Sequence, residues 1–171
     1  MSHRVDPGFG GERALGDKCA LPSSLYTGVR YKPLLTGGMA LLAGGAMPLA
    51  FAPVGWAWLA VIALATFFVL TAQSSRRQAL WSAYLFGLGY FGVGVSWVFI
   101  SISQYGNGPV VAVLVTAAFV SLLALFPWGV AYLVRCLRPE MDAMALWLGL
   151  PAAWVLSEWM RTWFLTGFPW L

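Results

Sequence analysis

Apolar residues along this chain gather in long blocks, and polar residues are confined to the short segments that separate the blocks. Between Lys32 and Arg135 the only charged side chains are those of Arg76 and Arg77. A helix needs about 20 apolar residues to cross a hydrocarbon layer of about 30 Å, and each block is close to that length. We therefore predict an all-α integral membrane protein with about five transmembrane helices, at residues 34–52, 56–72, 79–103, 110–134 and 143–166.

The segments between the blocks carry signals that end helices. Pro48 and Pro53 are expected to bend and then end the first block, because proline lacks the amide donor that a helix needs. The polar sequences QSSRRQ, QYGNGP and RCLRPEMD separate the later blocks. Residues 1–33 are rich in Gly and Pro and contain no apolar run, so we expect a disordered cytoplasmic tail there and a transmembrane domain over 34–171.

The basic residues alternate from one connection to the next. Five Lys or Arg residues precede the first block, two lie at Arg76 and Arg77, two at Arg135 and Arg138, and none at 53–55 or 104–109. Basic connections stay on the cytoplasmic side of a membrane. This alternation predicts a multi-pass membrane protein with a cytoplasmic N-terminus.

Composition supports a membrane protein and argues against several other classes. Hydrophobic residues make up 60% of the chain and charged residues 9%, where a soluble domain has about 25% charged residues. The net charge of +4 is not gathered on one face, so we expect no nucleic-acid partner. Cys19 and Cys136 are both expected in the cytoplasm, where disulfides are rare, and with the single His3 they form no metal-ligand pattern. We expect no cofactor.

Glu158 and Arg161 are charges inside the last apolar block and are the first candidates for a functional site. They are three residues apart on one helix face, so they can form an ion pair. A lone charge at the membrane centre costs at least about 2.5 to 3.5 kcal/mol, and charged residues in membranes default to functional roles. The pair fits either a contact to a lipid head group or another domain, or a salt bridge near the outer end that fixes the rotation of the helix.

The third block adds two weaker candidates. Gly87, Gly89, Gly92 and Gly94 remove side chains over two helical turns, which favours close packing against a neighbouring helix over binding of an acyl chain. Trp97, Gln104 and Tyr105 lie in the polar run SWVFISISQYGNG at the end of the block. Trp and Tyr are common at membrane interfaces as anchors, so anchoring is favoured over substrate contact.

Two stretches resemble a known family. The sequences FGVGVSWVFISISQYGNGP (91–109) and LPAAWVLSEWMRTWFLTGFPWL (150–171) are similar to the membrane region of bacterial apolipoprotein N-acyltransferases, supported by residues 48–60 and 83–92. The resemblance implies a multi-pass enzyme of the bacterial inner membrane. Such an enzyme moves an acyl chain from a membrane phospholipid to the amino group of the diacylglyceryl-modified N-terminal cysteine of an apolipoprotein. It also implies a periplasmic nitrilase-like domain that carries a catalytic Glu, Lys and Cys.

None of those three catalytic residues has a counterpart in this chain, so we expect no catalytic residue here. We interpret the chain as the membrane region of such an enzyme, truncated before the nitrilase-like domain and inactive alone, and a second polypeptide that supplies that domain would be a partner. The alternative is a non-catalytic membrane scaffold, for example for a polyprenol-phosphate mannosyltransferase. A transporter or channel is less favoured, because we find no inverted repeat and no string of charges along a helix.

Overall fold

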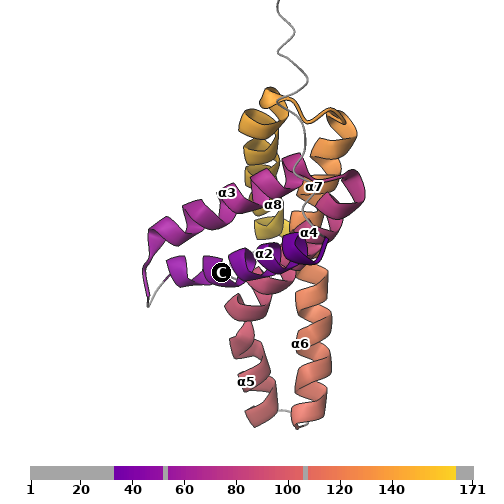
Figure 1. Cartoon of the computed structure of the whole chain (residues 1–171). Coiled ribbons are helices and arrows are strands. Elements are labelled where there is room, and N and C mark those ends of the chain that lie inside the picture. Colours follow the sequence, from indigo (N-terminus) through magenta and orange to yellow (C-terminus); the bar gives the residue numbers. More distant parts are fainter. Residues whose placement is uncertain (1–32, 52–53, 106–107, 165–171) are drawn as a thin grey trace, which may run out of the picture.

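The computed structural model describes residues 33–51, 54–105 and 108–164, and the part of the chain that it describes is helical without strands (Figure 1). The expected all-α class is therefore confirmed for these residues. The expected tail at 1–33 lies, except for Pro33, outside them, as does the segment 165–171. The helices are α2 (Pro33–Ala46), the 3₁₀ helix η2 (Met47–Ala50), α3 (Ala57–Gln73), α4 (Arg76–Gly94), α5 (Ser96–Tyr105), α6 (Pro109–Leu123), α7 (Leu125–Leu137), the π-helical η3 (Ala145–Gly149) and α8 (Leu150–Phe164).

Each apolar block forms helix, but four of the five blocks are divided. The first changes from α-helix to 3₁₀ helix at Met47–Ala50, which contains Pro48, and the expected end at Pro53 lies outside the described residues. The block at 110–134 divides at Ala124, because the ring of Pro127 prevents a helical hydrogen bond to the carbonyl four residues earlier. In the last block a π-helical turn precedes Pro151, which likewise has no amide proton to donate.

The sequence predicted a single helix over residues 79–103, and this prediction is wrong. The block divides at Val95 into α4 and α5, whose axes are bent by 50°. Gly92 and Gly94 immediately precede the break, and glycine weakens a helix because it lacks a side chain and gains the most freedom on unfolding. The polar end of this block therefore lies on α5, whose axis points away from that of α4.

The expected number of five crossings is not confirmed. By length and apolar character, two of the described helical segments can cross a membrane, Pro33–Ala50 and Pro109–Leu137. The bent pair α4 and α5 would make a third if it forms one span. Helix α3 is apolar but has 17 residues, and the last block is divided between η3 and the 15 residues of α8. The structure thus supports two or three spans.

Helix α4 is the centre of the fold, and its most extensive contact is with α2. Two glycines make this contact close: a Cβ atom on Gly44 would lie 2.0 Å from the carbonyl oxygen of Phe86, and one on Gly89 would lie 2.2 Å from that of Leu41. Gly87 makes a similar approach to Ala124. The expectation of close helix packing is therefore confirmed for Gly87 and Gly89, whereas a Cβ on Gly92 would meet nothing within 4 Å.

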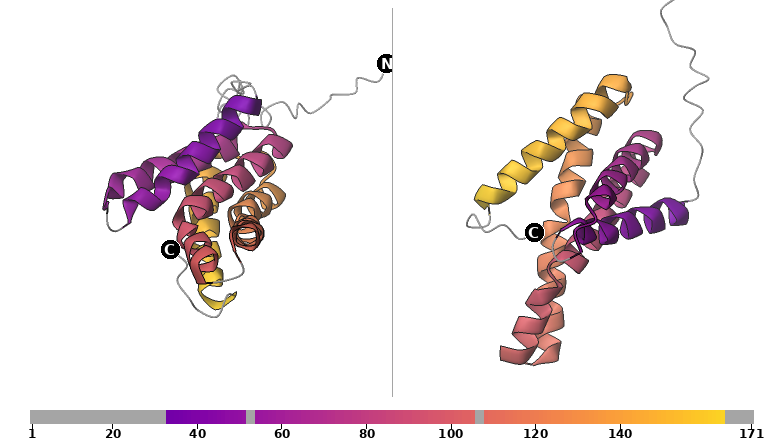
Figure 2. Two further views of the ribbon diagram at one scale, coloured as in Figure 1. Left: turned by 90° about the horizontal axis from the view of Figure 1, so that it is seen from below. Right: turned by 90° about the vertical axis from the view of Figure 1, so that its left-hand side faces the viewer.

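The helices do not form a single parallel bundle. In Figure 1, α2 and α3 run across the long direction that α6 and α7 define together. Helices α5 and α6 pack against each other and extend beyond the rest of the molecule, as both Figure 1 and the right-hand view of Figure 2 show. No residue of α5 is fully buried. The core therefore lies mainly among α2, α3, α4, α7 and α8, and the end of α6 joins it through Val120 and Leu123. Helix α5 and the first part of α6 extend beyond this core.

The two basic connections predicted to share one side of the membrane lie together in the structure. Arg76, at the start of α4, donates a hydrogen bond of 3.4 Å to Sγ of Cys136 near the end of α7, and its guanidinium lies 5.8 Å from the centre of the Tyr132 ring. Arg135 reaches the end of α3. This arrangement agrees with the alternation of basic connections along the sequence.

Candidate functional site

Glu158 and Arg161 form the expected ion pair. They lie one turn apart on α8, and the guanidinium of Arg161 donates a hydrogen bond to Oε2 of Glu158. The two partners differ in exposure: the Arg161 side chain is 10% exposed and that of Glu158 is 36% exposed. The arginine therefore faces the protein, and the carboxylate lies at the edge of the site, where a second cationic or hydrogen-bonding group can reach it.

Arg161 is held against α4 by aromatic rings. Its guanidinium carbon lies 5.2 Å from the centre of the Phe91 ring and 5.9 Å from that of Tyr90. A cation within about 6 Å of an aromatic ring gains about 0.5 to 2 kcal/mol, with the larger values at sites away from water. The paired carboxylate and the two rings together compensate for removing this charge from water, so the buried arginine is stable where it lies.

An aromatic cluster fixes the rotation of α8 and so aims the ion pair at α4. Trp154 lies one turn before Glu158, and its ring centre is 5.5 Å from that of Phe67, 6.0 Å from Phe86 and 6.4 Å from Tyr90. These partners come from α3 and α4. Edge-on and tilted aromatic pairs at such distances add about 0.5 to 1.5 kcal/mol each to the burial of the rings. Neither this cluster nor the rings beside Arg161 were anticipated from the sequence.

Two of the three α5 candidates, Gln104 and Tyr105, do not join this site. Both are exposed at the last turn of α5, Tyr105 to 89%, while Trp97 lies in the first turn of α5 and is also exposed. That end of α5 is the tip of the α5–α6 hairpin, which lies away from α8 in Figure 1 and in the right-hand view of Figure 2. The sequence-based candidates thus divide into one assembled pair and three residues on a separate helix.

Arg135 is a polar centre that the sequence analysis treated only as a marker of topology. The side chain is buried, and its Nη2 donates hydrogen bonds to the carbonyl oxygens of Thr71 at 2.6 Å, Ala72 at 3.3 Å and Ser74. The last carbonyls of a helix have no partners within the helix and carry a partial negative charge. Arg135 therefore closes the C-terminal end of α3. The last turn of α3 contains no glycine or basic residue of its own, and this was the one sign in the sequence that a distant residue must cap the helix.

The described residues offer no metal centre. They contain no group of three or more His, Cys, Asp or Glu side chains that could hold a metal ion. Cys136 is a free and exposed thiol, and Cys19 and His3 fall outside the described residues.

Comparison with known proteins places these helices in a family. Residues 43–171 match the model of the apolipoprotein N-acyltransferase N-terminal domain, which covers α3 to α8 and the end of α2. The chain is 44% identical over 144 residues to the apolipoprotein N-acyltransferase of Methylococcus capsulatus and 42% identical over 136 residues to that of Coxiella burnetii. The enzyme of Vibrio parahaemolyticus is 37% identical over 133 residues. The chain belongs to the apolipoprotein N-acyltransferase family.

The match to apolipoprotein N-acyltransferases covers most of this chain but a small part of the relatives. It includes 78% of the chain and 27% of the Methylococcus protein, 78% and 28% for the Coxiella protein, and 77% and 26% for the Vibrio protein. The chain therefore spans about a quarter of the length of these apolipoprotein N-acyltransferases. The Glu158–Arg161 pair and its aromatic surroundings on α4 all lie inside the matched region.

Proposed function

We propose that this chain is the membrane region of an apolipoprotein N-acyltransferase. The complete enzyme would transfer an acyl chain from a phospholipid to the amino group of the diacylglyceryl-cysteine at the N-terminus of an apolipoprotein. An ester bond of the phospholipid breaks, an amide bond forms, and the lysophospholipid leaves. The observation that carries this proposal is the family match over residues 43–171, which contains nearly every described helix.

The proposal assigns the chemistry and the membrane functions to different parts of the enzyme. A catalytic Glu, Lys and Cys would belong to a nitrilase-like domain, in the same polypeptide or in a second one, and the helices described here would anchor that domain and admit the lipid. The apolar helices fit the acyl chains. The Glu158–Arg161 pair fits the polar part of the lipid, because Arg161 is held by rings while Glu158 stays partly exposed.

The proposed setting is the bacterial inner membrane, with the N-terminus in the cytoplasm and five crossings. The contact between the connections at residues 74–77 and 135–138 supports the alternation on which this topology rests. The ends of α5 and α8 would then face the periplasm, where the apolipoprotein substrate is presented. Labelling of single cysteines introduced at Tyr105 and at Arg77, with a reagent that does not cross the membrane, tests it. Labelling at Tyr105 alone is expected, and labelling at Arg77 would contradict the topology.

The division of functions predicts that the chain alone transfers no acyl group. The test is a gel-shift assay with a diacylated lipopeptide, phosphatidylethanolamine and the purified chain, with the complete Methylococcus enzyme as the positive control. Turnover by the chain above a mock preparation would refute the assignment. Co-purification of a glycosyltransferase with the chain from native membranes would favour a scaffold for such an enzyme instead.

The role of the ion pair is tested in the complete Methylococcus enzyme, at the positions aligned with Glu158 and Arg161. Replacement of both residues by Gln is expected to reduce acyl transfer, and the matched control is Glu158→Gln alone, which leaves Arg161 against its rings and keeps an amide oxygen that can accept its hydrogen bond. If the pair serves only to fix α8, the Glu158→Gln variant keeps its activity. If the carboxylate contacts the lipid, both variants lose activity although both proteins fold. Unchanged activity in the double Gln variant would eliminate the proposed role.

A further inference from the structure

A continuous apolar groove follows the seam between α7 and the last helical segment. Its first part has a volume of about 390 Å³ and its second part about 260 Å³, and the two parts share Leu133, Ala153 and Leu156. The lining residues recur at about four-residue intervals on both helices, so they form one stripe along each helix. Small residues on the wall, among them Ala145, Gly149 and Ala152, leave the space open.

The groove has the length of a lipid acyl chain in one leaflet. On α7 its lining runs from Leu125 to Leu137, and the 13 residues of α7 span about 20 Å at 1.5 Å per residue. One leaflet contributes half of the hydrocarbon thickness, about 15 Å. An acyl chain that enters at the Leu137 end can therefore lie along the groove over its full depth in that leaflet.

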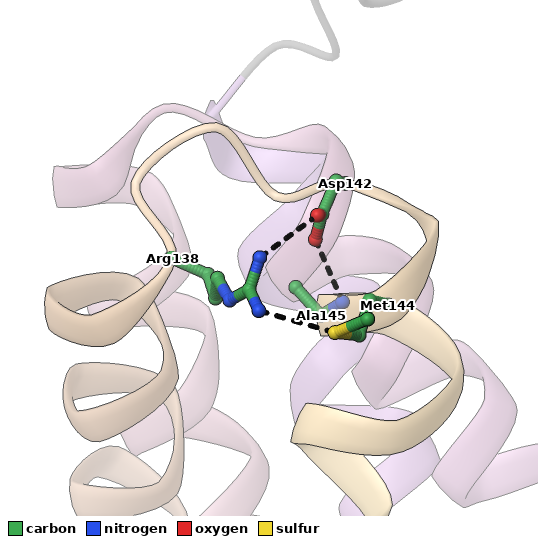
Figure 3. Close-up of polar contacts among 4 residues, drawn as sticks. All are labelled: Arg138, Asp142, Met144 and Ala145. Carbon is green, nitrogen blue, oxygen red and sulfur yellow. Dashed lines mark hydrogen bonds and ion pairs between the residues drawn. The ribbon is translucent and has the colours of Figure 1, made fainter.

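Arg138 stands at one end of this groove and is half-exposed, and it is the only charged residue among the residues that line the groove. Its Nη1 donates to Oδ2 of Asp142 at 3.2 Å, and the other oxygen of Asp142 accepts the backbone amide of Ala145 at 2.9 Å (Figure 3). Asp142 thereby holds the guanidinium of Arg138 at the mouth of the groove. It also caps the helical segment that forms the other wall of the groove. The hydrogen bond from the Ala145 amide fixes the Asp142 carboxylate, and the carboxylate in turn positions Arg138.

The second guanidinium nitrogen of Arg138 has only a weak acceptor. Its Nη2 lies 3.1 Å from Sδ of Met144, a residue that also lines the groove (Figure 3). A thioether sulfur is a poor hydrogen-bond acceptor, whereas a phosphate oxygen forms strong bonds to guanidinium groups. A phosphate at this position would displace the flexible Met144 side chain and gain a better bond.

The surrounding charges favour an anion. The connections at residues 74–77 and 135–142 carry four arginines (Arg76, Arg77, Arg135 and Arg138) and only two carboxylates, Glu140 and Asp142. The hydrogen bonds from Arg76 and Arg135 hold these two connections together. Basic pockets between helices at the cytoplasmic surface are typical sites for anionic lipid head groups.

We propose that the α7–α8 groove binds one anionic phospholipid, with its phosphate on Arg138 and an acyl chain along the stripe from Leu137 to Leu125. The lipid belongs to the leaflet on the arginine side of the protein. It is held as a structural ligand and is not the acyl donor, so this site is independent of the Glu158–Arg161 pair. The proposal therefore stands or falls separately from the proposed acyltransferase role.

The first test measures retention of added lipid by native mass spectrometry of the purified full chain in detergent. Phosphatidylglycerol is expected to stay bound as one adduct, in preference to phosphatidylcholine of the same acyl chains. Arg138→Gln is expected to weaken that adduct about tenfold, the loss expected for one charge-assisted hydrogen bond. Arg77→Gln is the matched control, because Arg77 is on the same surface but does not line this groove. Equal losses in both variants would mean general surface attraction and would overturn the site.

The second test fills the groove. A Cβ on Gly129 would meet nothing within 4 Å, so Gly129→Leu places a side chain in the groove without a clash with backbone. It is expected to remove the phosphatidylglycerol adduct, whereas Gly92→Leu, at an equally open position outside the groove, is expected to keep it. Retention of the adduct in Gly129→Leu would overturn the proposal. So would a dimer that forms at the same face and excludes the lipid.

A third measurement uses the unaltered protein and does not depend on how any variant folds. Phosphatidylglycerol with a diazirine midway along one acyl chain is crosslinked by light, and the attachment sites are mapped by peptide mass spectrometry. Attachment is expected on α7 and α8 around Leu133 and Leu156, where the two parts of the groove meet. Attachment spread evenly over α5 and α6 as well would show only the lipid annulus and would overturn the site.

Discussion

The close contact between α2 and α4 predicts that alanine destabilises the protein at one glycine of α4 and not at another. Only the tertiary structure distinguishes the two positions. Gly89 and Gly92 are three residues apart in the same helix, and alanine at either position raises intrinsic helix stability by about 0.5 to 1 kcal/mol. The positions differ only in their surroundings. A Cβ on Gly92 would meet no atom within 4 Å, whereas one on Gly89 would lie 2.2 Å from the carbonyl oxygen of Leu41 and 2.7 Å from the amide nitrogen of Gly45.

The magnitude follows from these distances. An ordinary contact of a Cβ atom begins at 3.4 Å, so Gly89→Ala would require α2 to move away from α4 by about 1 Å. Both clashing atoms belong to the backbone and cannot rotate away. A gap of 0.5 to 1 Å already removes a quarter to a half of a dispersion contact, and overpacking of this kind costs about 1 to 3 kcal/mol. The gain in helix propensity is the same at both positions and cancels in the comparison, so we expect Gly89→Ala to be about 1 to 3 kcal/mol less stable than Gly92→Ala.

The assay is reversible unfolding of the purified chain in mixed micelles with increasing SDS, followed by the circular dichroism of its helices. Gly92→Ala serves as the matched control and is expected to be as stable as the unaltered chain or slightly more stable. A Gly89→Ala variant as stable as Gly92→Ala would refute the close α2–α4 packing on which the reasoning rests.

Three further predictions concern the polar contacts. Arg135→Gln is expected to destabilise the chain by about 2 to 3 kcal/mol in the same SDS titration, because the end of α3 loses a charged donor. The control Arg77→Gln is expected to leave the midpoint unchanged, and equal midpoints for the two variants would contradict the cap. Asp142→Ala is expected to cost about 1 to 2 kcal/mol through loss of the cap of the last helical segment, seen as faster amide exchange in its first turn, and unchanged exchange would contradict it. Arg161→Gln is expected to destabilise the chain more than Glu158→Gln, because the arginine is the more buried partner, and the reverse order of midpoints would contradict the cation–aromatic contacts.

Much of the local structure could be predicted from the sequence. The five apolar blocks form helix, four of them without any charged residue, and polar connections separate one block from the next. The small residues of the third block indicated close packing, and Glu158 and Arg161 indicated an ion pair from their spacing alone. These features depend on residues near one another in the chain, which is why a linear pattern reveals them.

The sequence was less informative where the outcome depends on contacts between distant segments. It did not predict the 50° bend at Val95, which turns the helix that ends with Gln104 and Tyr105 away from the α4 axis. From the sequence, Arg135 indicated only the topology, although its side chain caps a helix that ends more than sixty residues earlier. It also offered no means of choosing Tyr90 and Phe91, among many aromatic residues, as the partners of Arg161.

The sequence by itself determined that this protein is helical, suited to a membrane and a member of the apolipoprotein N-acyltransferase family. Helix formation and membrane partition follow from the side chains of each segment, and these act over a few residues. Only the tertiary structure decided which helices touch, because a glycine such as Gly89 permits a close approach but does not specify which helix makes it. The same holds for the groove between α7 and α8. Its stripes exist on each helix separately, and only the packing of the two helices places them opposite each other with Arg138 at one end.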